Sequence, residues 1–390
     1  MEKKTKRKNL LLRFLAFLFT LALIAGALSL VVFRDQLNMD ALKRYITYRS
    51  LIRDSQGQAQ SFPYDGGPND SFANLDGSLL VAGDTGIRLY SPAGVLLSDE
   101  SVSLSDPVVY ANRRYAVVYD VGGRALRLYD GHGLLLSLES EGKLLSATVN
   151  PSGWLAVTHQ KSGHKGAVTI FNGEQKKRMQ FNFSSRFVMD ALVAENNGTV
   201  AVVSMGQSGN GFSSYLSYYA LDSSLEAGTH PDSTPLAECD LGNSVALSLR
   251  ADGDRFRVLG DNSLSICSSR GERLARYDYS DRYLKEFSLE GSGFTALLLG
   301  KHRAGSAAEL VVLDREGQPA HTLSLNEQVL SLSAAGRYIG VLTADRLDIY
   351  TQDLTLYSSL EGTSGARRLL MREDGSAMLI GDTAFLYLPT

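Results

Sequence analysis

Residues 87–90 read Ile-Arg-Leu-Tyr, and this pattern of two apolar positions around a variable one, closed in most copies by an aromatic residue, recurs along the chain. Close copies are 126–129 (Leu-Arg-Leu-Tyr) and 347–350 (Leu-Asp-Ile-Tyr). Alternation of this kind predicts a β-strand. The eight copies begin at residues 87, 126, 168, 216, 264, 310, 347 and 384. A period of about 40 residues indicates a repeat architecture.

A second strand precedes each copy and starts after a polar turn. Asp374-Gly375 comes before the apolar run 377–380, and Asn197-Gly198 comes before 200–203. One further strand leads each unit and another trails it, so each unit contains four antiparallel strands. The units begin near residues 71, 107, 144, 188, 245, 283, 328 and 365. Four-stranded units of this length predict an all-β chain folded as an eight-bladed β-propeller, with seven blades as the alternative if one unit is degenerate.

The end of the chain gives a second reason to expect a closed ring. The eighth unit stops at 387–390, directly after its third strand, and lacks an outer strand. Residues 60–65 (Gln-Ser-Phe-Pro-Tyr-Asp) are able to supply that strand from the N-terminal side. Pro63 is compatible with an edge position, where no ladder hydrogen bond is needed from its nitrogen. We therefore expect the propeller to span 58–390.

The N-terminal part predicts a membrane anchor. Residues 1–13 form a basic tail, and the apolar run 14–33 is long enough to cross a bilayer of ~30 Å. A signal peptide cleaved after Ala27 is the alternative to an uncleaved anchor. The excess of Lys and Arg before the run places the N-terminus in the cytoplasm and the propeller outside the cell, as a single-pass protein of the cell membrane. Residues 34–57 form a linker with a short helix expected over 38–53.

Composition narrows the function classes. The chain has 390 residues, 44% of them apolar, and a net charge of −3, which excludes wholesale disorder and gives no reason to expect nucleic acid as a partner. Its two cysteines, Cys239 and Cys267, exclude a disulfide-framed scaffold and a zinc site of four thiolates. We expect Cys267 to be a small buried residue, and an exported domain leaves a disulfide between the two open.

The repeated unit resembles WD40-like and quinoprotein-like propellers, without their signature motifs. The single tryptophan, Trp154, is not followed by aspartate. The order of basic tail, apolar span, short helix and propeller is similar to that of functionally uncharacterised, single-pass membrane-anchored β-propellers of Gram-positive anaerobic bacteria. This resemblance implies an extracytoplasmic bacterial protein and brings no functional motif with it.

Motifs for catalysis and cofactor binding are not found. The six histidines lack metal-ligand spacing, and the chain has no phosphate-binding loop. It also has no nucleophile elbow: residues 206–211 come near that motif but are expected to form a flexible loop. The sequence therefore predicts no catalytic residue, no metal site and no cofactor.

Loops hold the candidate binding residues. In a propeller, the loops between second and third strands and those between blades share one face, and three of the former are expected to be long: 160–167, 206–214 and 300–308. Two of them contain basic clusters, and function concentrates on such loops. The clusters are Lys161, His164 and Lys165, and Lys301, His302 and Arg303. They predict an interaction face for an anionic ligand or an acidic cell-envelope protein, and the alternative is two solvated insertions.

Together these observations predict a membrane-tethered, extracytoplasmic propeller that acts as a non-enzymatic binding or scaffolding module of the cell envelope. The alternative is a propeller enzyme of the hydrolase or lyase type, with its site in the central channel. A channel lined by carboxylates or histidines favours the enzyme, and an apolar or blocked channel favours the scaffold.

Overall fold

The computed structural model describes residues 14–21, 24, 39–67, 69–209, 211–221 and 234–389. The chain divides into two compact units, one of residues 1–50 with residue 390 and one of residues 51–389. Helix α2 (Met39–Tyr48) belongs to the first unit. The second unit is the propeller.

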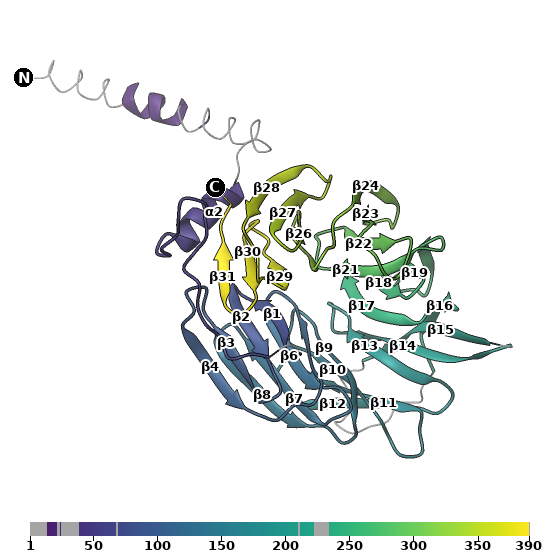
Figure 1. Cartoon of the computed structure of the whole chain (residues 1–390). Helices are drawn as coiled ribbons and strands as arrows, with labels where there is room; N and C mark the ends of the chain where they lie inside the picture. Colours follow the sequence, from purple (N-terminus) through teal and green to yellow (C-terminus); the bar gives the residue numbers. More distant parts are fainter. Residues whose placement is uncertain are drawn as a thin grey trace, which may run out of the picture. The chain divides into compact units, whose positions relative to one another are not determined.

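The propeller has eight blades in the described part of the chain, as the repeats predict: seven antiparallel sheets of four strands and one of three (Figure 1). Blades 1 and 2 contain β1 (Ser71–Leu75), β2 (Ser78–Ala82), β3 (Gly86–Tyr90), β4 (Leu96–Ser101), β5 (Pro107–Ala111), β6 (Tyr115–Asp120), β7 (Ala125–Asp130) and β8 (Gly133–Glu139). Blades 3 and 4 contain β9 (Leu144–Val149), β10 (Leu155–His159), β11 (Gly166–Phe171), β12 (Lys177–Phe183), β13 (Phe187–Val193), β14 (Thr199–Ser208), β15 (Gly211–Ala220) and β16 (Ala237–Gly242).

Blades 5 and 6 contain β17 (Ala246–Asp252), β18 (Arg255–Gly260), β19 (Ser263–Ser268), β20 (Arg273–Asp278), β21 (Tyr283–Ser288), β22 (Thr295–Gly300), β23 (Ala308–Leu313) and β24 (Pro319–Leu325). Blades 7 and 8 contain β25 (Ser331–Ala335), β26 (Tyr338–Leu342), β27 (Arg346–Thr351), β28 (Leu356–Glu361), β29 (Arg368–Met371), β30 (Ala377–Ile380) and β31 (Ala384–Tyr387). Every copy of the repeated pattern is the third strand of its blade.

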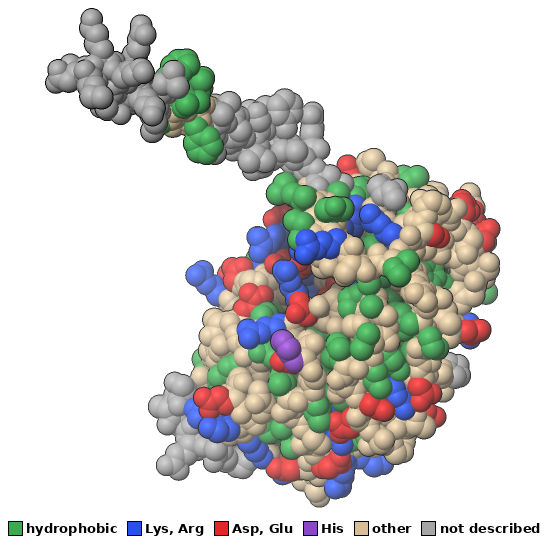
Figure 2. Space-filling view, turned by 90° about the vertical axis from the view of Figure 1, so that its left-hand side faces the viewer, with side chains coloured by type: hydrophobic (Ala, Val, Ile, Leu, Met, Phe, Trp, Pro, Cys, Tyr) green, Lys and Arg blue, Asp and Glu red, His purple; other side chains and the backbone are tan. Residues whose placement is uncertain are grey.

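Burial explains why the middle strands are the most apolar. Every residue of β10, β11 and β22 is buried, because each blade packs against both neighbours, so both faces of these strands are filled mostly by apolar residues. The outer strands β4 and β8 alternate between exposed and partly buried residues. On the side of the ring where β4 lies, charges of both signs are interspersed with hydrophobic side chains (Figure 2).

The first strands of successive blades lie side by side around the channel, and side-chain hydrogen bonds join them. The hydroxyl of Thr148 on β9 donates to the carbonyl of Ala191 on β13 at 2.6 Å. The amide of Ala334 on β25 donates to the hydroxyl of Ser288 on β21 at 2.9 Å. Such bonds satisfy buried polar groups and fix the register between blades.

Ring closure uses the N-terminal side of the chain. In Figure 1 blade 8, which ends with the last strand β31, lies beside blade 1. Gln58 and Phe62 form antiparallel bridges with Tyr387 and Ala384, and the amides of Phe62 and Ala384 each donate to the other residue's carbonyl, at 2.9 and 3.0 Å. The outer strand of blade 8 is therefore the segment 57–62, which we call the latch; it begins three residues before the stretch suggested by the sequence.

Cys239 and Cys267 form a disulfide between blades 4 and 5. Cys239 lies on the outer strand β16, Cys267 on β19, and their Cα atoms are 6.5 Å apart. Both are buried beside Leu241 and Phe256. Cys267 is buried, as expected, and the disulfide that the sequence left open is formed because β16 packs on the third strand of the next blade.

Two local predictions also need correction. Of the helix expected over 38–53, the structure shows Met39–Tyr48. Arg53 instead forms an antiparallel bridge with Ala59, and in the turn between them the carboxylate of Asp54 accepts hydrogen bonds from the amides of Gln56 and Gln58. The expected loop 206–214 is mostly strand: β14 and β15 stay paired to their tip, where Ser208 lies opposite Gly211.

The predicted membrane span lies mostly outside the described residues. Residues 14–21 and 24 are helical and exposed. Within the described ranges, no helix combines the length and apolar character that crossing a membrane requires.

Asp190, on the first strand of blade 4, makes the stability of the fold depend on pH. Burial raises the pKa of this carboxyl to about 6, and the hydrogen bond from the Ala191 amide and the charge of Arg250 offset this only in part. In the unfolded chain the pKa is about 3.9. The folded protein therefore binds the proton more tightly, and its stability falls as the pH rises from about 4 to about 6.

Replacement Asp190→Asn is expected to remove this penalty. The free energy of unfolding should rise by about 1–3 kcal/mol at neutral pH and change little near pH 4, measured by urea unfolding at both pH values. Asp382→Asn is the control, because the Asp382 side chain is 94% exposed. An equal gain for Asp190→Asn at both pH values would contradict the assignment.

Candidate functional site

The first predicted cluster lies on the loop between β10 and β11 of blade 3. The amide of His164 donates to the carbonyl of Lys161 at 3.1 Å and closes a turn in which Gly163 has a φ of 79°. Glycine tolerates this left-handed conformation, so the loop can turn back tightly. The turn leaves His164 and Lys165 exposed and Lys161 half-buried.

These residues border an open depression of about 1080 Å³ between blades 2, 3 and 4, which we call the basic groove. Its lining includes an apolar set from the starts of β9 and β13 and the middle of β14, and a charged set from three loops. The apolar residues are Leu145, Phe187, Val188, Met189 and Met205, and the charged ones are Arg124, Glu141, Lys143, Lys161 and Lys165.

The apolar floor of the basic groove is partly open to solvent. Phe187 is 54% exposed although it is a large aromatic residue, while its neighbour Val188 is buried. The ammonium of Lys165 lies 5.1 Å from the centre of the Phe187 ring and donates to the carbonyl of Ser185 at 2.8 Å. A cation over an aromatic face is attracted to it, so Lys165 is held at the rim.

Electrostatics make the basic groove positive. The ammonium groups of Lys161 and Lys177 bind Glu141 at 2.9 and 2.6 Å, and these hydrogen bonds lower the pKa of that carboxyl to about 2. Among the described residues, the side chains of Arg124 and Lys143 form no ion pair. Their charges are therefore available to an anionic group that enters from solvent.

The second predicted cluster lies elsewhere, on the loop between β22 and β23 of blade 6. Lys301, His302 and Arg303 are all exposed, and the guanidinium of Arg303 lies 5.6 Å from the centre of the Tyr283 ring. Arg303 borders a depression of about 780 Å³ whose other charged residues are Lys285, Asp261 and Glu286, whereas Lys301 and His302 do not line it. Charges of both signs balance there, in contrast to the basic groove.

The loop arrangement puts both clusters on the same face of the ring, with blades 4 and 5 between them. The structure thus brings Lys161, His164 and Lys165 together with further cations, but it does not bring the two clusters together. Arg124 and Lys143 were missed because they lie on short connections, each directly before the first residue of β7 or β9. Both residues lie on loops of that same face, so the face on which a loop lies, and not its length, is the signal that identifies them.

Solved structures with similar folds support the architecture. The C-terminal WD40 domain of Sif2 superposes with a TM-score of 0.61 at 12% identity, covering 87% of this chain and 100% of that one. BamB from Moraxella catarrhalis superposes with a TM-score of 0.50 at 13% identity, covering 85% and 97%. At these identities the similarity shows the fold, and it confirms the predicted propeller class.

Sequence comparison adds the family. No protein of curated function matches the chain. Residues 55–364, most of the propeller, match the family described as "Family of unknown function (DUF5711)". The chain therefore belongs to the DUF5711 family.

Proposed function

We propose that this protein is a membrane-tethered, extracytoplasmic binding module that holds an acidic peptide segment of a cell-envelope partner in the basic groove. The observation that carries the proposal is the groove itself: an apolar floor with Phe187 half-exposed, bordered by four cations and one carboxylate. Exposed aromatic residues are favoured at protein interfaces, and the surrounding cations select the charge of the partner.

Charge complementarity favours an acidic partner over a neutral one. The chain as a whole has a net charge of −3, so a positive groove is a local exception. A cleft of one sign attracts ligands of the opposite sign and speeds their association. The acidic segment needs at least one apolar side chain to cover the ring of Phe187 and the neighbouring Met189.

Two features support a location outside the cytoplasm. The disulfide between Cys239 and Cys267 is of a kind that forms and persists in oxidising compartments. The apolar run 14–33, preceded by the basic tail 1–13, has the length and charge asymmetry of a signal anchor that keeps its N-terminus inside.

One experiment tests both peptide binding by the basic groove and the location of the propeller outside the cell. The full chain is produced in a Gram-positive host, the cells are converted to protoplasts, and a membrane-impermeant fluorescent peptide of Asp and Glu residues around one central Phe is added. We expect the peptide to be retained on the protoplasts. Arg124→Glu with Lys143→Glu should weaken its binding by at least about tenfold, and raised salt should weaken it as well.

Charge reversal on blade 6 is the matched control. Lys301→Glu with Arg303→Glu changes the net charge by the same amount on the same face, and we expect peptide binding to stay unchanged. If the two pairs of replacements weakened peptide binding equally, the basic groove would not be the binding site. If the peptide bound the purified protein but not the protoplasts, the proposed location of the propeller outside the cell would be wrong.

A further inference from the structure

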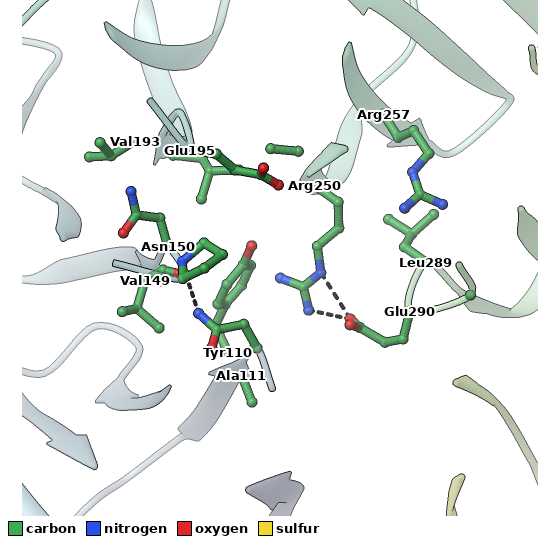
Figure 3. A pocket seen from close by; sticks show the side chains of 15 residues that line it. Tyr110, Ala111, Val149, Asn150, Val193, Glu195, Arg250, Arg257, Leu289 and Glu290 are labelled. Atoms are coloured by element: carbon green, nitrogen blue, oxygen red, sulfur yellow. Dashed lines mark hydrogen bonds and ion pairs between the residues drawn. The ribbon is translucent and has the colours of Figure 1, made fainter. Parts of the chain in front are cut away.

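A smaller cavity lies at the opposite end of the channel from the basic groove, where the first strands of blades 2 to 6 end. It has a volume of about 160 Å³ (Figure 3). Its lining includes apolar residues, among them Val149, Pro151, Leu192, Val193 and Leu289. Polar side chains from all five of these blades also line it, so apolar surface and convergent polar groups, the two elements of a small-molecule site, meet in this cavity.

Arg250, near the end of β17, is the best-fixed of these polar groups. Its Nε and Nη2 atoms donate to Oε1 of Glu290 at 2.9 and 2.6 Å, and its guanidinium lies 3.6 Å from the centre of the Tyr110 ring. Figure 3 shows the guanidinium between Tyr110 and Glu290. The remaining nitrogen, Nη1, is buried and has no hydrogen-bond partner.

An unpaired buried guanidinium nitrogen is unusual, because leaving a buried donor unsatisfied costs about 1–3 kcal/mol. Glu290 already occupies the other side of the guanidinium, so the open position is held in place before any ligand arrives. Arg257, also in the lining, has a buried unpaired Nε. An oxygen acceptor in the cavity would satisfy such a donor, and a carboxylate is the acceptor that matches a guanidinium best.

Two further groups remain open at the same cavity. Among the described residues, neither the hydroxyl of Tyr110 nor the carboxylate of Glu195 has a hydrogen-bond partner, and Glu195 is exposed at the rim. The amides Asn112 and Asn150 are already used: their side-chain nitrogens donate to the carbonyls of Val149 and Ala194 in the next blades. The groups that remain available to a ligand are therefore the hydrogen-bond donors of Arg250 and Tyr110 and the acceptor oxygens of Glu195.

We propose that this cavity is a binding site for a small amino acid, whose carboxylate is bound by Arg250 and Tyr110 and whose ammonium is bound by Glu195. Drug-sized ligands need cavities of about 300–1,000 Å³, so the occupant here is smaller. The apolar residues of the lining suit a short aliphatic side chain. This site does not depend on the basic groove, because the two lie at opposite ends of the channel and share no residue.

The test uses the purified full chain and each standard amino acid at about 10 mM, and thermal unfolding and calorimetry measure binding. Each amino acid has two comparison ligands: the carboxylate that lacks its ammonium group and the amine that lacks its carboxylate. We expect at least one small aliphatic amino acid to bind and to raise the unfolding temperature, and both comparison ligands to bind at least about tenfold more weakly.

Two variants test the residues. Arg250→Lys keeps a cation for Glu290 but removes Nη1, and Glu195→Gln alters an exposed side chain that the fold does not need; each should weaken amino acid binding at least about tenfold. Glu174→Gln, which changes an exposed glutamate of blade 3 outside the cavity, should have no effect. If no amino acid binds, if the carboxylate alone binds equally well, or if neither variant changes the affinity, the proposal is wrong.

Discussion

Replacement Phe62→Ala is expected to lower the free energy of unfolding by about 3–5 kcal/mol, the range for removing a buried aromatic side chain. Phe62 is 6% exposed and its ring lies 5.9 Å from that of Tyr90 in blade 1, while its backbone pairs with Ala384 in blade 8. One side chain therefore joins the first blade to the last. Chemical denaturation measures the loss.

Hydrogen exchange gives a second measure of the same variant. The amides of Ala59 and Phe62 donate to the carbonyls of Leu386 and Ala384, and we expect both to lose protection before the rest of the ring. Phe212→Ala is the matched control, because Phe212 is 38% exposed near the tip of the β14–β15 hairpin. A loss no larger than that of the control would show that the latch does not close the ring.

Reduction of the disulfide is expected to have the second largest effect. Cys239 and Cys267 are separated by 28 residues, and cross-linking a loop of that length restricts the unfolded chain by about 3–4 kcal/mol in the chain-entropy model. We expect reductant, or the double replacement Cys239→Ala with Cys267→Ala, to lower the free energy of unfolding by about 3 kcal/mol.

Guanidinium unfolding with and without reductant measures this difference. The double variant is its own control, since reductant should leave its unfolding curve unchanged. Oxidised protein that unfolds at the same denaturant concentration as reduced protein would contradict the expectation, and so would two free thiols detected in protein purified without reductant.

The number of blades can be predicted from the sequence because every blade has the same pattern of buried and exposed strand positions. A third strand such as Ile87–Tyr90 or Leu347–Tyr350 is buried on both sides, so its apolar pattern survives in every unit. Contacts between blades leave no such pattern. The disulfide joins residues whose strands become neighbours only after packing, and the latch pairs residues separated by most of the chain.

The same reasoning explains which part of the candidate sites was predictable. Lys161, His164 and Lys165 stand out because they are clustered on one long loop. Arg124 and Lys143 join them only through the ring geometry. Arg250, Glu290 and Tyr110 come from three different blades, and each looks in sequence like an ordinary polar residue near the end of a strand.

The latch also constrains how the chain is synthesised. Phe62 leaves the ribosome early, but its partner Ala384 follows about 320 residues later, which at ordinary translation rates is a delay of roughly 20–60 s. Throughout that time seven blades can assemble while an apolar side chain and an unpaired backbone edge stay uncovered. Premature termination anywhere before β31 should therefore leave an open arc that recruits chaperones or proteases, even when every blade already made is correctly folded.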